Sequence, residues 1–262
     1  MTENAVWTGG QVAENIRCVL APNPSPMTLE GTNTWIWGRV GWDSCVVVDP
    51  GPDISEHRDA ILRYCHGLAP KVSAILLTHD HADHSAGASA LSQATGAPVL
   101  GARNNTATEG ELTLISPNGP RLYIALLPGH TADSIGIIFP DEKVIATGDT
   151  IFAYGSAMID WPDGSLRDYL SSLNRLKAII AERGLTRIIP GHGAVITNPL
   201  DQIADYYGHR MMRLSQVREV MDESVDDIIR HIFGDIEPGL YRAAWSTIQT
   251  QLEYLRETRD NQ

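Results

Sequence analysis

Three histidines and two aspartates occur within six residues, in the segment His79-Asp80-His81-Ala82-Asp83-His84. Imidazole and carboxylate groups are the ligands that zinc and similar divalent ions take in proteins. Residues two apart on an extended chain point the same way, so His79 and His81 can close on one ion. Asp83 and His84 can then face a second ion. Burying so many titratable groups is costly unless something pairs with them, so the segment favours a metal site.

Asp83 has a second interpretation, because an aspartate at a helix start commonly caps the helix. Apolar residues 72–77 before the segment predict a buried strand, and residues 85–95 after it predict a helix. Ligands of an open α/β layer usually bind at this end of a strand. Beside three histidines, we therefore prefer the ligand interpretation for Asp83.

Three further predicted strands also end in a metal-competent side chain next to glycine. These side chains are His130, Asp149 and His192, after the apolar segments 122–127, 144–147 and 187–189. Glycine allows the tight turn and close backbone approach that a ligand loop needs. Each residue alone could be ordinary turn chemistry, but four such strand ends together are hard to obtain by chance.

Length and composition indicate a single large domain, or a large domain followed by a small one. The net charge of −12 over 262 residues argues weakly against a long nucleic-acid partner. Cys18, Cys45 and Cys65 lack C-x-x-C spacing, which favours reduced thiols. We find neither a leader-like N-terminus nor a membrane-length apolar stretch, so we expect a cytoplasmic protein without a membrane partner.

The remaining pattern alternates strands and helices up to Pro199 and is helical afterwards. Further predicted strands cover 16–20, 34–37, 45–49, 98–100 and 135–139, and predicted helices cover 54–66, 166–183, 200–220, 225–233 and 240–255. His57, His66, His209 and His231 lie on these helices, where we expect packing or surface roles. The apolar faces of the last three helices must bury against the first part of the chain or a second subunit, so the oligomeric state stays open.

Several residues near the expected site have two interpretations. Asp49 is either a solvated turn residue or an acceptor that orients a metal-bound histidine. Asn33 and Tyr154 could donate to a developing oxyanion or satisfy local turns. Three apolar residues either wall a substrate pocket or cover the sheet: Met158, Ile159 and Trp161.

The ligand order resembles the five-motif signature of the metallo-β-lactamase-fold hydrolases, with a spacing close to that of glyoxalase II. The resemblance runs from about Asn15 to Pro199. Within the family, the chain is most similar to the β-lactamase-like-protein-2 branch. The supporting segments are the loop 23–34, Pro-Gly-His-Thr at 128–131 and Pro-Gly-His-Gly at 190–193.

This resemblance implies an α/β fold, a four-layer αββα sandwich over residues 1–204 with two divalent ions at its edge. It also implies a small helical, winged-helix-like domain over 205–262. It assigns His79, His81 and His130 to one ion, Asp83, His84 and His192 to the other, and Asp149 to a bridge. Zinc is the first expectation for the metal, with manganese or iron as alternatives. Diiron electron-transfer members carry Glu at the position of His81, and true β-lactamases of this fold lack the bridging aspartate, which disfavours both roles.

The leading functional hypothesis is a dinuclear metal-dependent hydrolase of a small ester, thioester or lactone. Two ions can activate a shared water for attack on a carbonyl, with Asp83 as catalytic acid–base. The alternative is a metal-dependent endoribonuclease or phosphodiesterase acting on single-stranded RNA, as in some members of the branch. Acidic residues outnumber arginines after Pro199, which counts against it. A β-lactamase-like side activity ranks lower, and the absence of a basic recognition helix argues against DNA as a partner.

Overall fold

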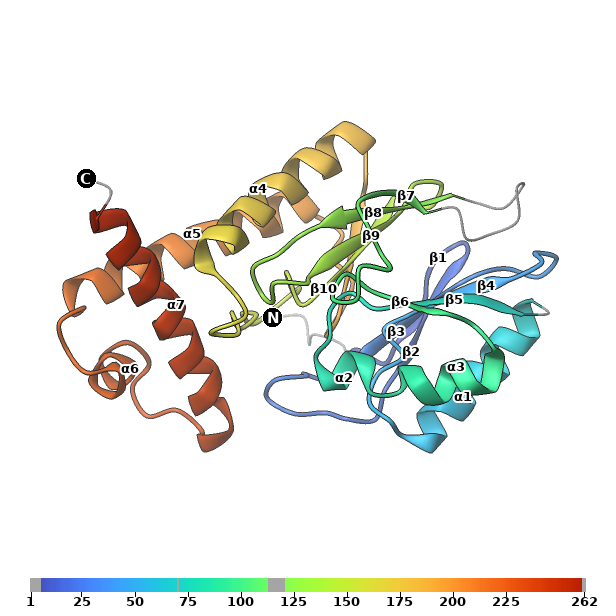
Figure 1. Ribbon diagram of the computed structural model, residues 1–262, viewed down its shortest axis with the longest axis horizontal. Coiled ribbons are helices and arrows are strands. Elements are labelled where there is room, and N and C mark those ends of the chain that lie inside the picture. The colour runs from blue at the N-terminus through green and yellow to red at the C-terminus, as the bar shows by residue number, and fades with distance from the viewer. Residues whose placement is uncertain (1–5, 70, 113–120, 261–262) are drawn as a thin grey trace.

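The computed structural model describes residues 6–69, 71–112 and 121–260 and contains two sheets that pack face to face (Figure 1). The first sheet has the spatial order β1 (Gly10–Ala13), β2 (Ile16–Leu20), β3 (Asn33–Trp37), β4 (Cys45–Val48), β5 (Val72–Leu76) and β6 (Val99–Leu100). The second has the order β11 (Arg187–Pro190), β10 (Val144–Gly148), β9 (Ile135–Phe139), β8 (Leu122–Leu126) and β7 (Gly110–Leu112). Parallel pairing joins β4, β5 and β6, and also β10 and β11, while the other neighbours are antiparallel.

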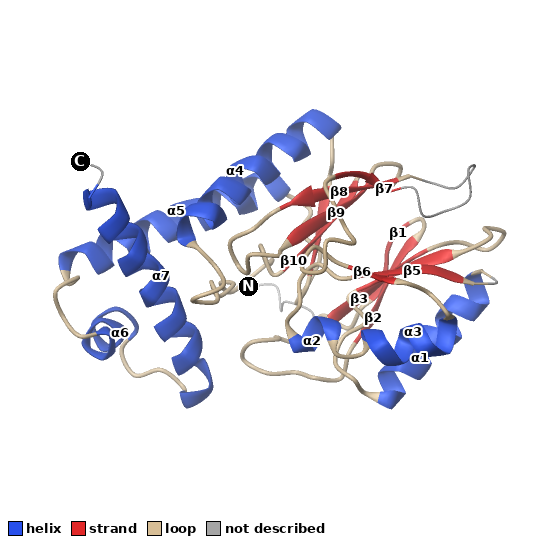
Figure 2. Ribbon diagram, viewed as in Figure 1, coloured by secondary structure: helices blue, strands red, loops and turns tan. Residues whose placement is uncertain are grey.

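Helices cover the outer face of each sheet and complete the expected four-layer αββα sandwich (Figure 2). The first sheet is covered by α1 (Ser55–Leu68) and α3 (Ala88–Thr95), with the short α2 (Ala82–Ser85) between β5 and α3. The second sheet is covered by α4 (Leu166–Arg183).

Both faces of the central strands are buried, which explains their continuous apolar sequences. On β3, Trp35 and Trp37 pack between the two sheets, whereas Ile36 packs toward α1. The neighbouring β4 repeats the pattern, with Val46 and Val48 on the inner face. Because both faces are covered, each strand must end at an edge of the sandwich before it can present a polar side chain.

Local signals fix both ends of α4, whose predicted bounds are confirmed. The Ser165 hydroxyl accepts a hydrogen bond from the backbone N–H of Asp168, which caps the first turn. Gly184 ends the helix in the left-handed region, with φ 61°. The helix therefore packs along its full length on the second sheet.

The chain ends in α5 (Pro199–Glu219), α6 (Val225–Phe233), the 3₁₀ turn η1 (Pro238–Leu240) and α7 (Tyr241–Asp260). Their buried apolar residues belong to the same hydrophobic cluster as those of α4. Residues 199–260 contain no strand, so this helical region carries no β-wing there. Since α5 runs through the predicted boundary at 204/205, the two-domain division stays a prediction, and 1–5, 70, 113–120 and 261–262 lie outside the described residues.

The structure differs from the sequence-based expectation in a few elements. The helix predicted over 85–95 is split into α2 and α3, because the turn between them docks on the loop after β4: Gly51 N–H bonds to His84 O and Gly87 N–H to Gly51 O. The edge strands β1 and β7 were not predicted, since each is short and contains glycine and polar residues. Within the described residues, no helix has the length and apolarity needed to span a membrane.

Candidate metal centre

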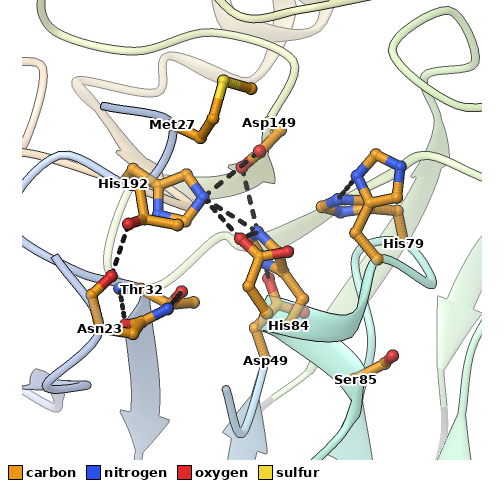
Figure 3. Close-up of polar contacts among 12 residues, drawn as sticks. Asn23, Met27, Thr32, Asp49, His79, His84, Ser85, Asp149 and His192 are labelled. Carbon is orange, nitrogen blue, oxygen red and sulfur yellow. Dashed lines mark hydrogen bonds and ion pairs between the residues drawn. The ribbon is translucent and has the colours of Figure 1, made fainter. Parts of the chain in front are cut away.

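The predicted ligands meet at one edge of the sandwich, where four segments come together (Figure 3). His79 and His81 follow β5, and Asp83 and His84 lie on α2. The other three follow strands of the second sheet: His130 after β8, Asp149 after β10 and His192 after β11. Strand ends of both sheets thus place all seven side chains around one volume.

One group of donors consists of His79, His81 and His130. The Nδ1 atom of His81 lies 3.1 Å from Nε2 of His79 and 3.1 Å from Nε2 of His130. Two nitrogens on a tetrahedral zinc ion lie roughly 3.3 Å apart, given zinc–nitrogen bonds of about 2.0–2.1 Å. The separations found are close to this value, so the three nitrogens suit one ion.

A second group consists of Asp83, His84 and His192. The Nε2 atom of His192 lies 3.2 Å from Asp83 Oδ2 and 3.3 Å from Nε2 of His84. Asp83 is not the helix cap that the alternative interpretation required, because His81 occupies the N-cap position of α2. Its side chain instead faces the two histidines and is 32% exposed toward solvent.

Asp149 lies between the two groups. Its Oδ1 atom is 3.2 Å from Nε2 of His84, and its Oδ2 atom is 3.4 Å from Nε2 of His192 and 3.9 Å from Nε2 of His130. The buried Oδ1 atom has no hydrogen-bond donor among the described residues. The geometry is that expected of a carboxylate shared by two ions.

Each of the five histidines also makes a hydrogen bond through its outer ring nitrogen. The pairs are His79 Nδ1 with Thr78 Oγ1 (3.1 Å), His81 Nε2 with Asp160 Oδ2 (3.0 Å), His84 Nδ1 with Asp49 Oδ2 (2.9 Å), His130 Nδ1 with Met158 O (2.6 Å) and His192 Nδ1 with Gly31 O (3.2 Å). A neutral imidazole has one N–H, and these acceptors hold it on the outer side. In the neutral rings the inner nitrogens then direct their lone pairs at one another, an arrangement that fits a cation.

Asp49 and Thr78 complete this outer layer. Asp49 is 1% exposed and accepts from Thr78 N–H at 2.8 Å and from the Thr78 hydroxyl at 2.6 Å. The Thr78 hydroxyl therefore donates to Asp49 and accepts from His79. Two interpretations of Asp49 were left open. The structure supports the one in which Asp49 accepts a hydrogen bond from a histidine and so orients its ring.

Burial and the mixed charges shift the pKa values in opposite directions. Burial lowers the pKa of His79 and of His130. Burial also opposes the charged form of His192, yet Asp149 and Asp83 raise its pKa to about 9. The pKa of Asp149 is well below its usual value despite burial, because His192 and His84 lie beside it. In the absence of a cation, protons on histidine supply the positive charge that this cluster requires.

A pocket of about 900 Å³ extends from the donors to the C-terminal helices. Met27 and Leu29 from the β2–β3 loop and Phe152 form apolar parts of its wall near the donors. Met158 also lines the pocket, as one interpretation expected, but Ile159 is fully buried in the core. The Trp161 ring packs against Trp245 of α7, with ring centroids 5.4 Å apart.

The two candidate oxyanion donors have other partners. Asn33 is fully buried, and its amide donates to the carbonyl oxygens of Pro190 and Gly193 at 3.0 and 2.9 Å. It therefore ties β3 to the loop that carries His192. The Tyr154 hydroxyl donates to the carboxylate of Glu30. In this structure, both side chains support loops of the site.

Sequence reasoning missed four contributors to the site. Thr78, Asp160 and the carbonyl of Gly31 act as acceptors for ring nitrogens, and no pattern in the sequence marks them. For His57 only a packing or surface role was expected, but it is 3% exposed and contacts Thr34 Oγ1 at 2.8 Å, beside the strand ends. Its position on α1, six residues after the turn at Gly51, was the available signal.

Comparison with known proteins bears on the family and the fold of this chain. The sequence profile of the Metallo-beta-lactamase superfamily matches residues 28–109 and 100–192, which is more than half of the chain. A curated relative, the Beta-lactamase-like protein 2 homolog of Caenorhabditis elegans, is 26% identical over 94% of this chain and 85% of its own length.

Solved structures share the fold. A Beta-lactamase domain protein from Burkholderia ambifaria superposes with a TM-score of 0.79 at 20% identity, over 95% of this chain and 88% of that one. A second protein, solved in a di-iron-bound form, has a TM-score of 0.54 at 25% identity, over 70% of this chain and 96% of that one. The first of these matches extends into the C-terminal helices.

Proposed function

Because the chain belongs to the metallo-beta-lactamase superfamily, whose members are metal-dependent hydrolases, we propose that it hydrolyses a small ester, thioester or lactone with two bound divalent ions. The observation that carries this proposal is the set of inner imidazole nitrogens and carboxylate oxygens that lie within 4.8 Å of one another in each donor group. Outer acceptors hold every ring of this set in the tautomer that a metal requires.

In the proposed site His79, His81 and His130 hold one ion, while Asp83, His84 and His192 hold the other and Asp149 contacts both. Zinc suits these nitrogen and oxygen donors, and manganese and iron are the alternatives. The relative solved in a di-iron-bound form supports keeping iron among them. When bound, such a pair of ions supplies an activated water and polarises the substrate oxygen.

Asp83 is the residue to which we assign proton transfer. It is the most exposed of the carboxylates among the donors, and it borders the pocket. Its Oδ2 atom approaches two histidine nitrogens, which lower its pKa against the effect of burial and keep it ionised. From this position it can take a proton from water and return it to the leaving group.

The pocket wall favours a carbonyl substrate with an apolar portion. Met27, Leu29, Phe152 and Met158 lie close to the donors and can bury hydrocarbon. A small-molecule substrate is also consistent with the acidic surface, since the net charge of −12 opposes long polyanions.

A phosphodiesterase acting on single-stranded RNA is the second candidate. One observation favours it: Arg242 lines the same pocket and its side chain is 85% exposed at the rim. A nuclease of this kind should bind RNA less tightly as salt rises. A β-lactamase-like side activity remains a weaker alternative.

The test is a panel of chromogenic thioesters, lactones, phosphodiesters and β-lactams with the metal-loaded protein. We expect hydrolysis of thioesters or lactones that a chelator abolishes and zinc restores. His81→Ala should reduce this rate at least about 100-fold, because it removes one metal ligand together with the hydrogen bond to Asp160 that orients it. Asp80→Ala is the matched control, since Asp80 is exposed and pairs with Arg103 at 3.2 Å. Activity that resists chelation, or wild-type rates in His81→Ala, would refute the proposal, and activity confined to phosphodiesters would favour the second candidate.

A further inference from the structure

One wall of the pocket is a face of α5. Gln202, Tyr206, His209 and Arg213 recur at helical spacing, and all of them line the pocket. Gln202 marks the end near the metal centre, because it donates to the carbonyl of Phe152 at 2.8 Å. The helix rises about 1.5 Å per residue, so Arg213 lies roughly 16 Å from Gln202 along α5.

The wall that α5 and α7 form in this pocket is basic. Arg213 lies on it with its guanidinium 4.8 Å from the centre of the Phe233 ring. Arg210 lines the pocket one turn closer to Gln202, and Arg242 of α7 lies 3.9 Å from Asp160, the partner of His81. The pKa of His209, which lies among them, is lowered by burial and then by the charges of Arg210 and Arg213.

Two of these arginines lack a carboxylate partner. Within the part of the chain that the structure describes, no carboxylate lies within 4.0 Å of Arg210 or Arg213, and the Nε atom of each is buried without an acceptor. Among these described residues, Arg213 donates through Nη1 to neutral groups only, Gln216 Oε1 at 3.0 Å and Ile232 O at 3.3 Å. Arg210 is only 3% exposed; the carbonyl of Ala157 accepts from it and its guanidinium lies 4.8 Å from the Tyr169 ring centre. A buried guanidinium without a counter-ion is unfavourable.

The acidic residues of the pocket do not balance these charges. Asp160 accepts from His81 at 3.0 Å and lies 3.9 Å from Arg242, so it is already engaged. Asp205 lies on α5 near the metal end and is exposed to solvent. The basic wall of the pocket therefore has two positive charges without a paired carboxylate, at Arg210 and Arg213, and each has an Nε–H without an acceptor among the described residues.

We propose that this basic wall of the pocket binds an anionic group of the substrate, a carboxylate or a phosphate, on the acyl part that is cleaved. Planar guanidinium groups bind either anion with paired hydrogen bonds. The apolar side chains of the pocket hold the hydrocarbon that joins the anion to the carbonyl. The substrate is then an acyl compound with a second, anionic group, an inference that rests on the proposed hydrolytic function.

The test uses thioesters of straight-chain dicarboxylic acids, from succinyl to hexadecanedioyl, each beside its methyl-capped and uncharged counterpart. We expect kcat/KM to favour the charged member about tenfold or more at one chain length, as for a charge-assisted hydrogen bond. A parallel series with a terminal phosphate shows which anion the pocket prefers. In Arg242→Met and in Arg213→Met, the ratio of kcat/KM for the charged thioester to that for the capped one should fall toward 1, mainly because KM for the charged thioester rises. Arg213→Lys should retain part of this preference.

Arg218→Met is the matched control, because Arg218 is exposed on α5 and does not line the pocket. Calorimetric binding of the long-chain diacid product to the metal-free protein gives a readout independent of catalysis, and its affinity should fall in Arg242→Met and with rising salt. Equal rates for charged and capped thioesters, with no diacid binding, would overturn the inference while leaving the hydrolase intact. Diacid binding that depends on the arginines, without hydrolysis of any thioester, would instead retain the anion site and reject the proposed function.

Discussion

The centre of this protein consists of imidazole nitrogens that face one another and that must carry no hydrogen when they bind a cation. Such a cluster is stable only if the ring N–H groups are held elsewhere, and acceptors such as Asp49 and the carbonyl of Gly31 do this. The second requirement of the cluster is that the backbone of a ligand loop can lie directly against the donor side chains. At Gly191 an added Cβ atom would collide with Asp149 Oδ1 and lie 2.6 Å from His84 Cε1.

Gly191→Ala should therefore reduce metal binding and activity while the fold is retained. We expect at least a tenfold loss of metal affinity, because both Asp149 and His84 must move. A competition titration against a chromogenic chelator measures the affinity, and circular dichroism reports the fold. Gly208→Ala is the control, since nothing lies within 4 Å of the Cβ it would add. An unchanged affinity in Gly191→Ala would show that the donor positions are not so tightly set.

At the scale of elements, the site is made by strands that end at the same edge of the sandwich. The sequence predicted these ends well, because buried strands appear as apolar runs and His130, Asp149 and His192 each follow one beside glycine. It could not predict which acceptors hold the rings. The partners Asp160 and Gly31 lie far along the chain from His81 and His192, and only the assembled fold brings them into contact.

Helix α1 adds a pH-sensitive contact to this edge. The Thr34 hydroxyl donates to Asp49 O at 2.7 Å and thus accepts from Nε2–H of His57. Burial lowers the pKa of His57 to about 4, below the value of about 6.5 in an unfolded chain. The neutral form is favoured by folding, so the stability it contributes is present above pH 6.5 and is lost as pH falls toward 4.

His57→Phe should make the metal-free protein less sensitive to acid. The wild type should lose about 3 kcal/mol of unfolding free energy more than the variant between pH 7 and pH 4, by linkage. Urea denaturation of both proteins across this range gives the difference. His66→Gln serves as the comparison, because His66 is exposed on the same helix. If the two pH profiles of wild type and His57→Phe run parallel, the buried neutral histidine is not the source of the acid sensitivity.

At the scale of the whole molecule, the C-terminal helices are joined to the sandwich by one hydrophobic cluster that also contains α4. Residues of α5 and α7 line the pocket together with residues of the sandwich, so the pocket depends on both parts of the chain. The sequence predicted these helices but not their contribution to the pocket, because an amphipathic face does not specify the surface it buries. The pairing of Trp161 with Trp245 shows which surface that is.

Ile248→Ala tests this coupling, since Ile248 is fully buried in the shared cluster. We expect a loss of about 2–5 kcal/mol in unfolding free energy. Near-ultraviolet signals and far-ultraviolet signals should fall together in one thermal transition, because Trp35 and Trp37 report the distant core between the sheets. Met212→Ala, at a position that is 48% exposed, should change little. Two separate transitions would instead favour independent folding of 1–204 and 205–262.

The most direct test of the account is the metal content of the purified protein, measured by plasma mass spectrometry against chain concentration. The seven donors predict two divalent ions per chain after loading with zinc and gel filtration. Asp149→Ala should reduce this number, because Asp149 is the residue placed between the two groups. A wild-type protein that retains no divalent ion under these conditions would contradict the dinuclear site. An Asp149→Ala protein that still retains two ions with unchanged affinity would contradict the position of Asp149 between them.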